Sequence, residues 1–288
     1  MNRSIFSELW FKMVHSGSRV SLFIGINAIV FFSIGIIYVL ETWFLSSLGI
    51  TIWIEDHLAL TAYLPALLYK PWSLLSYMFL HRDFFHFLFN MLGLFWFGRI
   101  FEDFLNSRQF TFTYFCGGLF GAALYIIFYN TIPAFGSAVF LSSLIGASAC
   151  VMAIIVAAAT LVPDYSLRLL LFGDVRLKFL ALFYVLVDIV SMAGSNAGGA
   201  IAHVGGALLG FVYIKQLKAG NDWSKIFDKR KKLKVVRNPQ TSGRSPSASS
   251  NYPDEAVIDQ ILDKISKSGY DSLTRQEKEQ LFKASNKE

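Results

Sequence analysis

The hydrophobic residues of this chain are gathered into long runs separated by short polar segments. Six runs lie at about residues 20–40, 82–101, 110–129, 139–162, 177–192 and 197–214. A helix needs roughly 20 apolar residues to cross the hydrocarbon core of a bilayer, and most of these runs have about that length. The pattern predicts an all-α, polytopic membrane protein built as a bundle of six spanning helices.

The polar segments differ in character. Residues 1–18 carry apolar side chains at helical spacing among polar ones, which is typical of an amphipathic helix on the membrane surface. Residues 41–80 contain several Trp and Tyr but are broken by charges and by Pro65. We therefore expect a long loop there, with short helices partly embedded at the membrane interface, where Trp and Tyr are enriched.

The C-terminal part changes composition after Trp223, becoming basic and then rich in Ser, Pro and Asn. This predicts an N-terminal segment 1–18, a membrane domain 19–217, a basic and disordered linker 218–252, and a short helical extension 253–288. The extension begins at Pro253 with one apolar-striped helix that Gly269 should stop. Thr274 and Glu277 then have the spacing of a capping box for a second helix. A docking module and a loosely ordered tail both fit this pattern, and its partner is unknown.

Composition and charge agree with a membrane protein. Of 288 residues, 54% are hydrophobic and 16% are charged, whereas soluble domains carry about 25% charged residues. Lys and Arg lie in alternate segments between the runs, and only Lys70 and Arg82 break this pattern, while residues 130–138 and 193–199 contain none. The positive-inside rule therefore places both termini in the cytoplasm. The net charge of +6 is then explained by the membrane surface rather than by nucleic acid. Cys116 and Cys150 lack metal-ligand spacing, and we expect buried thiols and neither metal nor cofactor.

Polar residues inside three of the runs suggest a chemistry. His86 and Asn90 share one helix face, Ser148 lies in the fourth run and His203 in the sixth. Singly, each has an ordinary structural explanation, such as a Ser bonded to its own helix. The predicted topology, however, puts all four at a similar depth in the outer half of the membrane.

That constellation suits acyl transfer, in which a His takes the proton of a Ser nucleophile. His86, the Asn90 amide and the backbone N–H of Ser148 are candidate donors to the oxyanion. Asp188, near the outer end of the fifth run, is expected to have a structural role, so a Ser148–His203 dyad without an acid is predicted.

At these residues the chain resembles the rhomboid intramembrane serine proteases, in their bacterial six-span form. The matching motifs are His81 with His86-x-x-x-Asn90, Gly146-x-Ser148, Ala202-His203-x-x-Gly206-x-x-x-Gly210, Trp72, and Gly98-Arg99-x-x-Glu102. The resemblance implies catalysis by Ser148 and His203 and binding of the oxyanion or substrate by His86, Asn90 and Ser148. It implies structural roles for His81, Gly146, Gly206, Gly210, Arg99 and Glu102. The implied substrates are single-span proteins in the lipid bilayer of the bacterial inner membrane.

Three positions depart from the family pattern. Ala149 stands where many members have Gly after the nucleophile, and Ser73 replaces the Arg of the first-loop Trp-Arg pair. Met152 stands where an aromatic residue often packs on the catalytic His, and a thioether can fill that place less rigidly.

Two other functions compete with proteolysis. A catalytically inactive rhomboid-like protein would bind membrane helices without cutting, but such relatives usually lack the Ser or the His that this chain has. A transporter is disfavoured because no internal repeat or second polar relay is evident. For an active enzyme we expect a lateral gate between the second and fifth runs, held by contacts between their aromatic residues. These are Phe84, Phe85, Phe87 and Phe89 on one side and Phe179, Phe183 and Tyr184 on the other.

Overall fold

Helices make up most of the structure, a computed structural model that describes residues 7, 10, 11, 13, 15–44, 48–169, 173–194, 196–227 and 255–285. The chain divides into two units, Met1–Lys229 and Arg230–Glu288. Most of the predicted amphipathic segment 1–18 lies outside the described residues.

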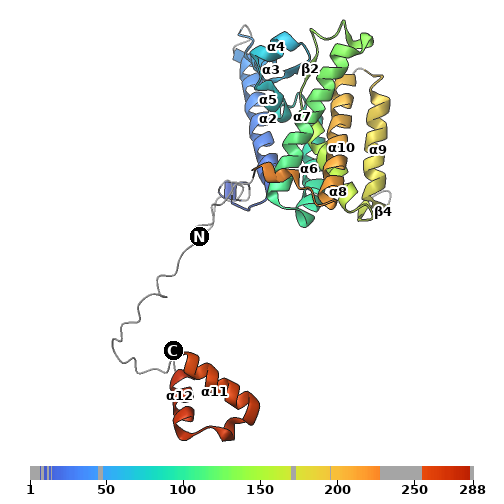
Figure 1. Ribbon diagram of the computed structural model, residues 1–288. Helices are drawn as coiled ribbons and strands as arrows, with labels where there is room; N and C mark the ends of the chain where they lie inside the picture. Colours follow the sequence, from blue (N-terminus) through green and yellow to red (C-terminus); the bar gives the residue numbers. More distant parts are fainter. Residues whose placement is uncertain are drawn as a thin grey trace. The chain divides into compact units, whose positions relative to one another are not determined.

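The first unit is a helical bundle (Figure 1). Its principal helices are α2 (Arg19–Phe44), α6 (Phe84–Phe104), α7 (Ser107–Thr131), α8 (Ser148–Leu161), α9 (Leu177–Ser191) and α10 (Ala197–Lys218). Among the described residues α2, α6, α7 and α10 are long and apolar enough to cross a membrane. The shorter α8 and α9 have 14 and 15 residues. The all-α, polytopic membrane fold predicted from the hydrophobic runs is therefore confirmed.

The structure corrects the prediction for the fourth run, because only the second half of that run is helical. We predicted a helix from about residue 139 to 162, but α8 begins at Ser148. Before it, β2 (Ser143–Leu144) pairs antiparallel with β1 (Leu60–Thr61), and Gly146 turns the chain with a φ of 122°. Val139, Leu144 and Ala147 of this segment are buried, whereas Phe140 and Leu141 are exposed. An apolar loop has the same mean hydropathy as an apolar helix, so the run did not reveal the break.

The short α8 brings its preceding loop into the depth of the bundle. At about 1.5 Å per residue its 14 residues span only ~21 Å, less than the ~30 Å of a hydrocarbon core. Irregular backbone at membrane depth is tolerated where protein or a water-filled cavity surrounds it, rather than lipid. Residues before Ser148 meet that condition, since Leu144 and Ala147 are buried.

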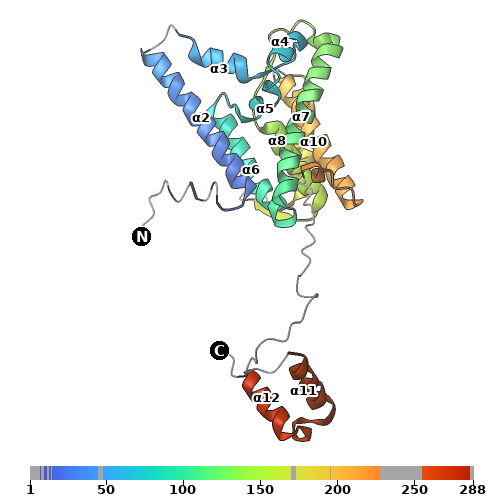
Figure 2. The same cartoon turned by 60° about the vertical axis from the view of Figure 1, so that its left-hand side comes forward.

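Helix α8 is the central helix of the bundle, and every residue from Ala149 to Ala159 is buried. Helices α7 and α10 lie alongside it (Figures 1 and 2). Gly206 and Gly210 of α10 face the backbone carbonyl oxygens of Ala149 and Ala153, and a Cβ at either glycine would overlap those oxygens. These two glycines therefore let the α8 and α10 backbones come into contact.

One end of the bundle gathers several helix termini. Glu102 at the end of α6 accepts hydrogen bonds from the Ser18 hydroxyl at 2.7 Å and from the Arg19 N–H at 2.6 Å, so it caps the start of α2. Arg108 at the start of α7 pairs with Asp222 at 2.8 Å, just beyond α10.

The predicted linker thus packs on the bundle at its beginning, through η3 (Trp223–Phe227) and the buried Ser224. Residues 228–252 of that linker, and the first two residues of the predicted extension, lie outside the described residues.

The first loop contains short helices, as predicted for residues 41–80. They are α3 (Ile50–Leu58), α4 (Leu64–Tyr69), α5 (Ser73–Ser76) and η1 (Tyr77–Phe79). The Trp72 indole donates to the His57 carbonyl at 2.9 Å, and Arg82 forms an ion pair with Glu55. Ser73, in place of an Arg, is fully buried. The remaining elements are η2 (Pro133–Phe135) and the β3 (Ser166–Leu169) and β4 (Gly173–Arg176) hairpin before α9.

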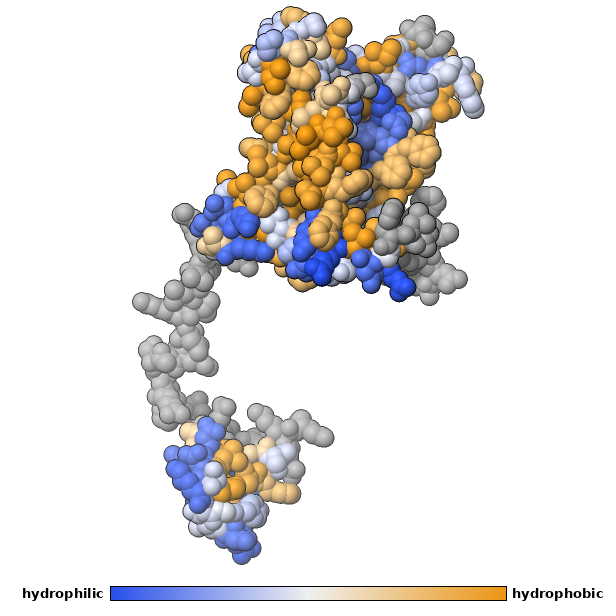
Figure 3. Space-filling view, turned by 90° about the vertical axis from the view of Figure 1, so that its right-hand side faces the viewer, coloured by the Kyte–Doolittle hydropathy of each residue, from blue (hydrophilic) through white to orange (hydrophobic). Residues whose placement is uncertain are grey.

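The surface of the bundle is hydrophobic over most of the face in Figure 3, with hydrophilic residues along its lower edge. A hydrophilic patch interrupts the hydrophobic surface in the upper half of the same face. Large apolar side chains are exposed on α9, for example Phe183 and Val190, and this is the surface that lipid would cover.

The second unit consists of α11 (Glu255–Ser268), η5 (Tyr270–Ser272) and α12 (Arg275–Ser285). Gly269 has a φ of 78° and its N–H reaches the Ile265 carbonyl, ending α11. Thr274 and Glu277 exchange the two bonds of a capping box at 2.7 and 3.3 Å. The helix pair, its stop and its cap are therefore confirmed. Ile261 and Leu273 form its small buried centre.

Candidate active site

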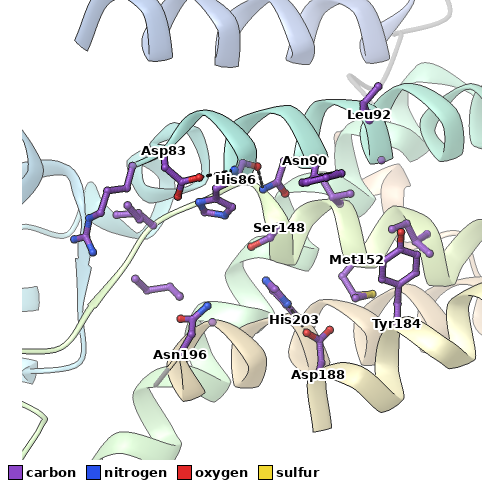
Figure 4. A pocket seen from close by; sticks show the side chains of 18 of the residues that line it. Asp83, His86, Asn90, Leu92, Ser148, Met152, Tyr184, Asp188, Asn196 and His203 are labelled. Atoms are coloured by element: carbon purple, nitrogen blue, oxygen red, sulfur yellow. Dashed lines mark hydrogen bonds and ion pairs between the residues drawn. The ribbon is translucent and has the colours of Figure 1, made fainter. Parts of the chain in front are cut away.

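A cavity of about 680 Å³ lies among α6, α8, α9 and α10 in the first unit. Its lining includes the four polar residues that the sequence singles out: Ser148, His203, His86 and Asn90. Figure 4 shows these side chains around one space, with Asp188 beside His203. The structure thus brings together residues separated by more than one hundred positions in the chain.

Ser148 is the first residue of α8, whereas a helix over the whole fourth run would have placed it in the helix interior. Its position has chemical consequences. The first N–H groups of a helix lack intrahelical partners, and the helix dipole is positive at this end. The backbone N–H of Ser148 is therefore one of several donors available to an anion beside the hydroxyl.

Two backbone N–H groups hold the loop before Ser148 in place. The Gly146 N–H donates to the Tyr77 carbonyl at 2.9 Å, and the Ala147 N–H reaches Nε2 of His81 at 3.5 Å. His81 is buried and lies edge-on to His86, with ring centroids 5.2 Å apart. These contacts give His81 a structural place below the loop.

Gly146 cannot carry a side chain here. A Cβ would lie 2.8 Å from the His86 ring and 3.4 Å from the Ser148 hydroxyl. Its φ of 122° is also a conformation that residues with a Cβ rarely adopt. The absent side chain leaves room for His86 and Ser148 to approach the same point.

His203 reaches the cavity from α10, and Nδ1 of its ring lies 2.8 Å from Oδ1 of Asp188 on α9. Its ring stands between Ser148 and Asp188 (Figure 4). The prediction that no acid is positioned beside the Ser–His pair is therefore wrong. Asp188 was visible in the sequence as a carboxylate inside an apolar run, a feature that usually marks a paired, functional residue in membranes.

Ser148 and His203 share the cavity, but no hydrogen bond joins them within the described part of the chain. Catalytic hydrogen bonds are often long or misaligned before substrate binds, and they tighten in the complex. The assignment of Ser148 and His203 as a pair therefore rests on their shared cavity and on their places in the adjacent helices α8 and α10.

His86 and Asn90 come from the first two turns of α6. Asp83 caps this helix by accepting the His86 N–H at 2.8 Å. The Asn90 amide nitrogen donates to the His86 carbonyl at 2.8 Å. One of its two hydrogens is thereby used within the helix, and the other remains for a ligand.

Met152 and Tyr184 also line the cavity, the first from α8 one turn after Ser148 and the second from α9. Figure 4 shows them close to His203 and Asp188. The thioether thus takes the predicted place near the histidine.

The aromatic contacts predicted for the gate are absent among the residues that the structure describes. Phe87 packs against Phe31 of α2, with ring centroids 4.4 Å apart, and so points away from α9. Among the residues that the structure describes, no aromatic ring of α6 contacts one of α9. Phe89 and Trp96 instead line the cavity from α6, facing the same space as Tyr184.

The remaining motif residues lie away from the cavity. Glu102 caps α2, and the Arg99 guanidinium stacks over the Phe95 ring of its own helix at 4.3 Å. Gly206 and Gly210 lie on the α8-facing side of α10, where they set the helix separation.

The comparisons with known proteins identify the class. A family model described as the Rhomboid domain matches residues 69–218. The chain belongs to the rhomboid family and is an integral membrane protein. This family contains intramembrane proteases and inactive relatives, and its membrane-protein substrates lie in the lipid bilayer.

A second model, a family of unknown function called DUF6576, matches residues 252–287. It covers the two helices of the C-terminal unit. No curated protein matches the chain.

Proposed function

We propose that this protein is an intramembrane serine endopeptidase that hydrolyses peptide bonds of single-span membrane proteins. The observation that carries the proposal is one cavity at membrane depth that holds Ser148 at a helix N-terminus and His203 from the neighbouring helix. Both residues that inactive relatives usually lack are present.

The chemistry follows from that arrangement. Nε2 of His203 accepts the proton of the Ser148 hydroxyl as the oxygen attacks the scissile carbonyl carbon. The tetrahedral oxyanion is stabilised by the Ser148 N–H at the start of α8, with His86 and the free Asn90 hydrogen as further donors. His203 then protonates the leaving amine, and water hydrolyses the acyl-enzyme by the reverse sequence.

A route for water to the cavity and the orientation of the protein in the membrane also support the proposal. The cavity lining includes Arg82 and Asp83, which mark a polar entrance at the end of the bundle opposite the Glu102 and Arg108 contacts. We place the Glu102 end and both termini in the cytoplasm, because basic residues concentrate on that side. The site would then open to the outer face of a bacterial inner membrane.

The experiment is cleavage of a single-span reporter by the purified full-length protein in detergent, with labelling of the nucleophile by a fluorophosphonate probe. Ser148→Ala and His203→Ala should abolish cleavage and labelling without lowering the thermal unfolding midpoint. Thr160→Ala is a matched control on α8, because its hydroxyl only bonds the Val156 carbonyl of its own helix. Undiminished cleavage by pure Ser148→Ala protein would exclude the mechanism. A wild type that binds the reporter but neither cuts it nor takes the probe would be an inactive relative.

A further inference from the structure

Asp188 makes a contact that the Ser148–His203 mechanism does not by itself require. Its Oδ1 lies 2.8 Å from Nδ1 of His203, and both side chains are largely withdrawn from the surface, at 13% and 21% exposure. Its other carboxylate oxygen is buried with no protein partner among the described residues. A carboxylate within a membrane helix is costly, so one that reaches a single histidine calls for a reason.

The rest of α9 offers no such reason. The helix is peripheral, and among its residues only Leu177 and Ala181 are buried. Ser191, one turn further on, merely bonds the Val187 carbonyl of its own helix at 2.7 Å. Asp188 is therefore the carboxylate that α9 directs into the bundle, where Tyr184 of the same helix also lines the cavity.

We infer that Asp188 is a positioning residue that fixes the tautomer and orientation of His203, an inference that rests on the proposed protease function. A carboxylate is acceptor-only when ionised, so Nδ1 of His203 must carry the hydrogen in this pair. Nε2 is then left as the bare nitrogen able to take a proton, on the side of the ring that faces Ser148 (Figure 4). The same carboxylate stabilises the imidazolium that forms when the proton has moved.

The other charged or titratable groups lining the cavity are Arg82, Asp83, His86 and Tyr184. The first three lie on or beside α6, across the cavity from α9, whereas Tyr184 lies on α9 one turn before Asp188. Within the described chain, no hydrogen bond joins any of these four side chains to His203, whose ring bonds Asp188. Asp188 is thus the group placed to govern this histidine. The site becomes a three-helix array: nucleophile on α8, base on α10 and orienting acid on α9.

The test compares Asp188→Asn and Asp188→Glu with wild type, measuring kcat and KM separately. Ser191→Ala is the matched control on the same helix. Each protein is assayed with a single-span reporter and with a soluble unstructured peptide that reaches the cavity from water. Asp188→Asn should lower kcat by about 100-fold or more on both substrates, with little change in KM, because the amide can hold the wrong tautomer. Asp188→Glu should recover part of that loss.

A purely structural tie between α9 and α10 predicts the opposite pattern. Loosening α9 would then leave peptide hydrolysis unchanged and would leave unchanged or speed cleavage of the membrane reporter. Wild-type kcat in Asp188→Asn, or this substrate-dependent gain, overturns the inference.

A second measurement needs no variant of Asp188. In ¹⁵N-histidine-labelled wild-type protein, with the His203 signals assigned by their loss in His203→Ala, Nδ1 should carry the proton. A neutral ring protonated at Nε2 overturns the inference even if Asp188→Asn does not fold. The experiments distinguish failure of the protease function from failure of the role of Asp188. A wild type without any cleavage contradicts the protease function. A cleaving wild type with an inactive Ser148→Ala and a fully active Asp188→Asn contradicts only the role of Asp188.

Discussion

The spacing of Ser148 and His203 depends on one glycine contact. Gly206 lies three residues after His203 on α10, and it faces the carbonyl oxygen of Ala149, the residue after Ser148. The helix contact and the reacting side chains are thus less than one turn apart. We predict that Gly206→Ala separates the pair and impairs catalysis more than stability.

The magnitude follows from what the added methyl meets. Its Cβ would overlap backbone atoms of Ala149, which cannot rotate away, so α10 and α8 must part by roughly an ångström to restore ordinary contact. Overpacking costs about 1–3 kcal/mol, and replacing a helical glycine returns about 0.5–1 kcal/mol. A displacement of 1 Å at reacting groups costs about 100-fold in rate, or ~2.7 kcal/mol. The loss of activity should therefore exceed the loss of stability.

Two further glycines serve as matched controls. Gly35→Ala in α2 places the methyl where no atom lies within 4 Å, so stability should be unchanged or slightly raised and activity kept. Gly210→Ala creates the same overlap with Ala153, one turn further from the pair, so it should match Gly206→Ala in stability but lose less activity. The assay is reporter cleavage beside thermal unfolding in the same detergent. Equal activity in Gly206→Ala and Gly35→Ala, or equal loss in Gly206→Ala and Gly210→Ala, would refute the reasoning.

Three other predictions concern the cap, the orientation and the C-terminal unit. Glu102→Gln should lower the free energy of unfolding by about 1–2 kcal/mol in thermal melts, because the α2 N-terminus loses its charged cap; an unchanged midpoint contradicts this. A cysteine at position 148 should react from the outer face with a thiol reagent that cannot cross membranes, and labelling only from the cytoplasm would reverse the topology. The hydrogen bond from Lys264, with those from Thr274, lowers the pKa of Glu277 to about 2. Its contribution to stability is then present above the unfolded value of ~4.3 and lost as pH falls toward 2. Amide exchange of residues 255–285 should accelerate over that range in wild type and not in Glu277→Gln.

The elements that the sequence predicts best are those specified locally. The C-terminal helices have an apolar stripe, a stopping glycine at 269 and a capping pair at 274 and 277, and each signal depends only on near neighbours. The spanning helices are similarly visible, since their length and apolarity are set by the bilayer. The start of α8 was not, because hydropathy measures burial and cannot separate a buried loop from a buried helix. Gly146 was a local sign of the break, together with Ser142 and Ser143.

Contacts between helices were harder to foresee. His86, Asn90, Ser148 and His203 could be assigned a common depth, because their motifs and the topology constrain it. Asp188 could not, because α9 has 15 residues and its depth and rotation depend on how it packs against α8 and α10. The aromatic residues of α6 were equally ambiguous. A ring that faces lipid and a ring that faces a neighbouring helix have the same hydropathy. For that reason the sequence did not reveal that Phe87 packs against α2.

The short central helix would let water and a substrate peptide bond meet within a bilayer, as the proposed function requires. A helix of about 21 Å leaves roughly 9 Å of hydrocarbon thickness unfilled along its axis. A cavity of about 680 Å³ lies there, lined by residues of α6, α9 and α10 and of the loop before Ser148. The same shortening places an uncapped N-terminus, with its free N–H groups, at the floor of the cavity. A full-length helix at this position would bury Ser148 in its middle and use those donors for its own hydrogen bonds. The break at Gly146 therefore supplies the cavity, the donors and the exposed hydroxyl together.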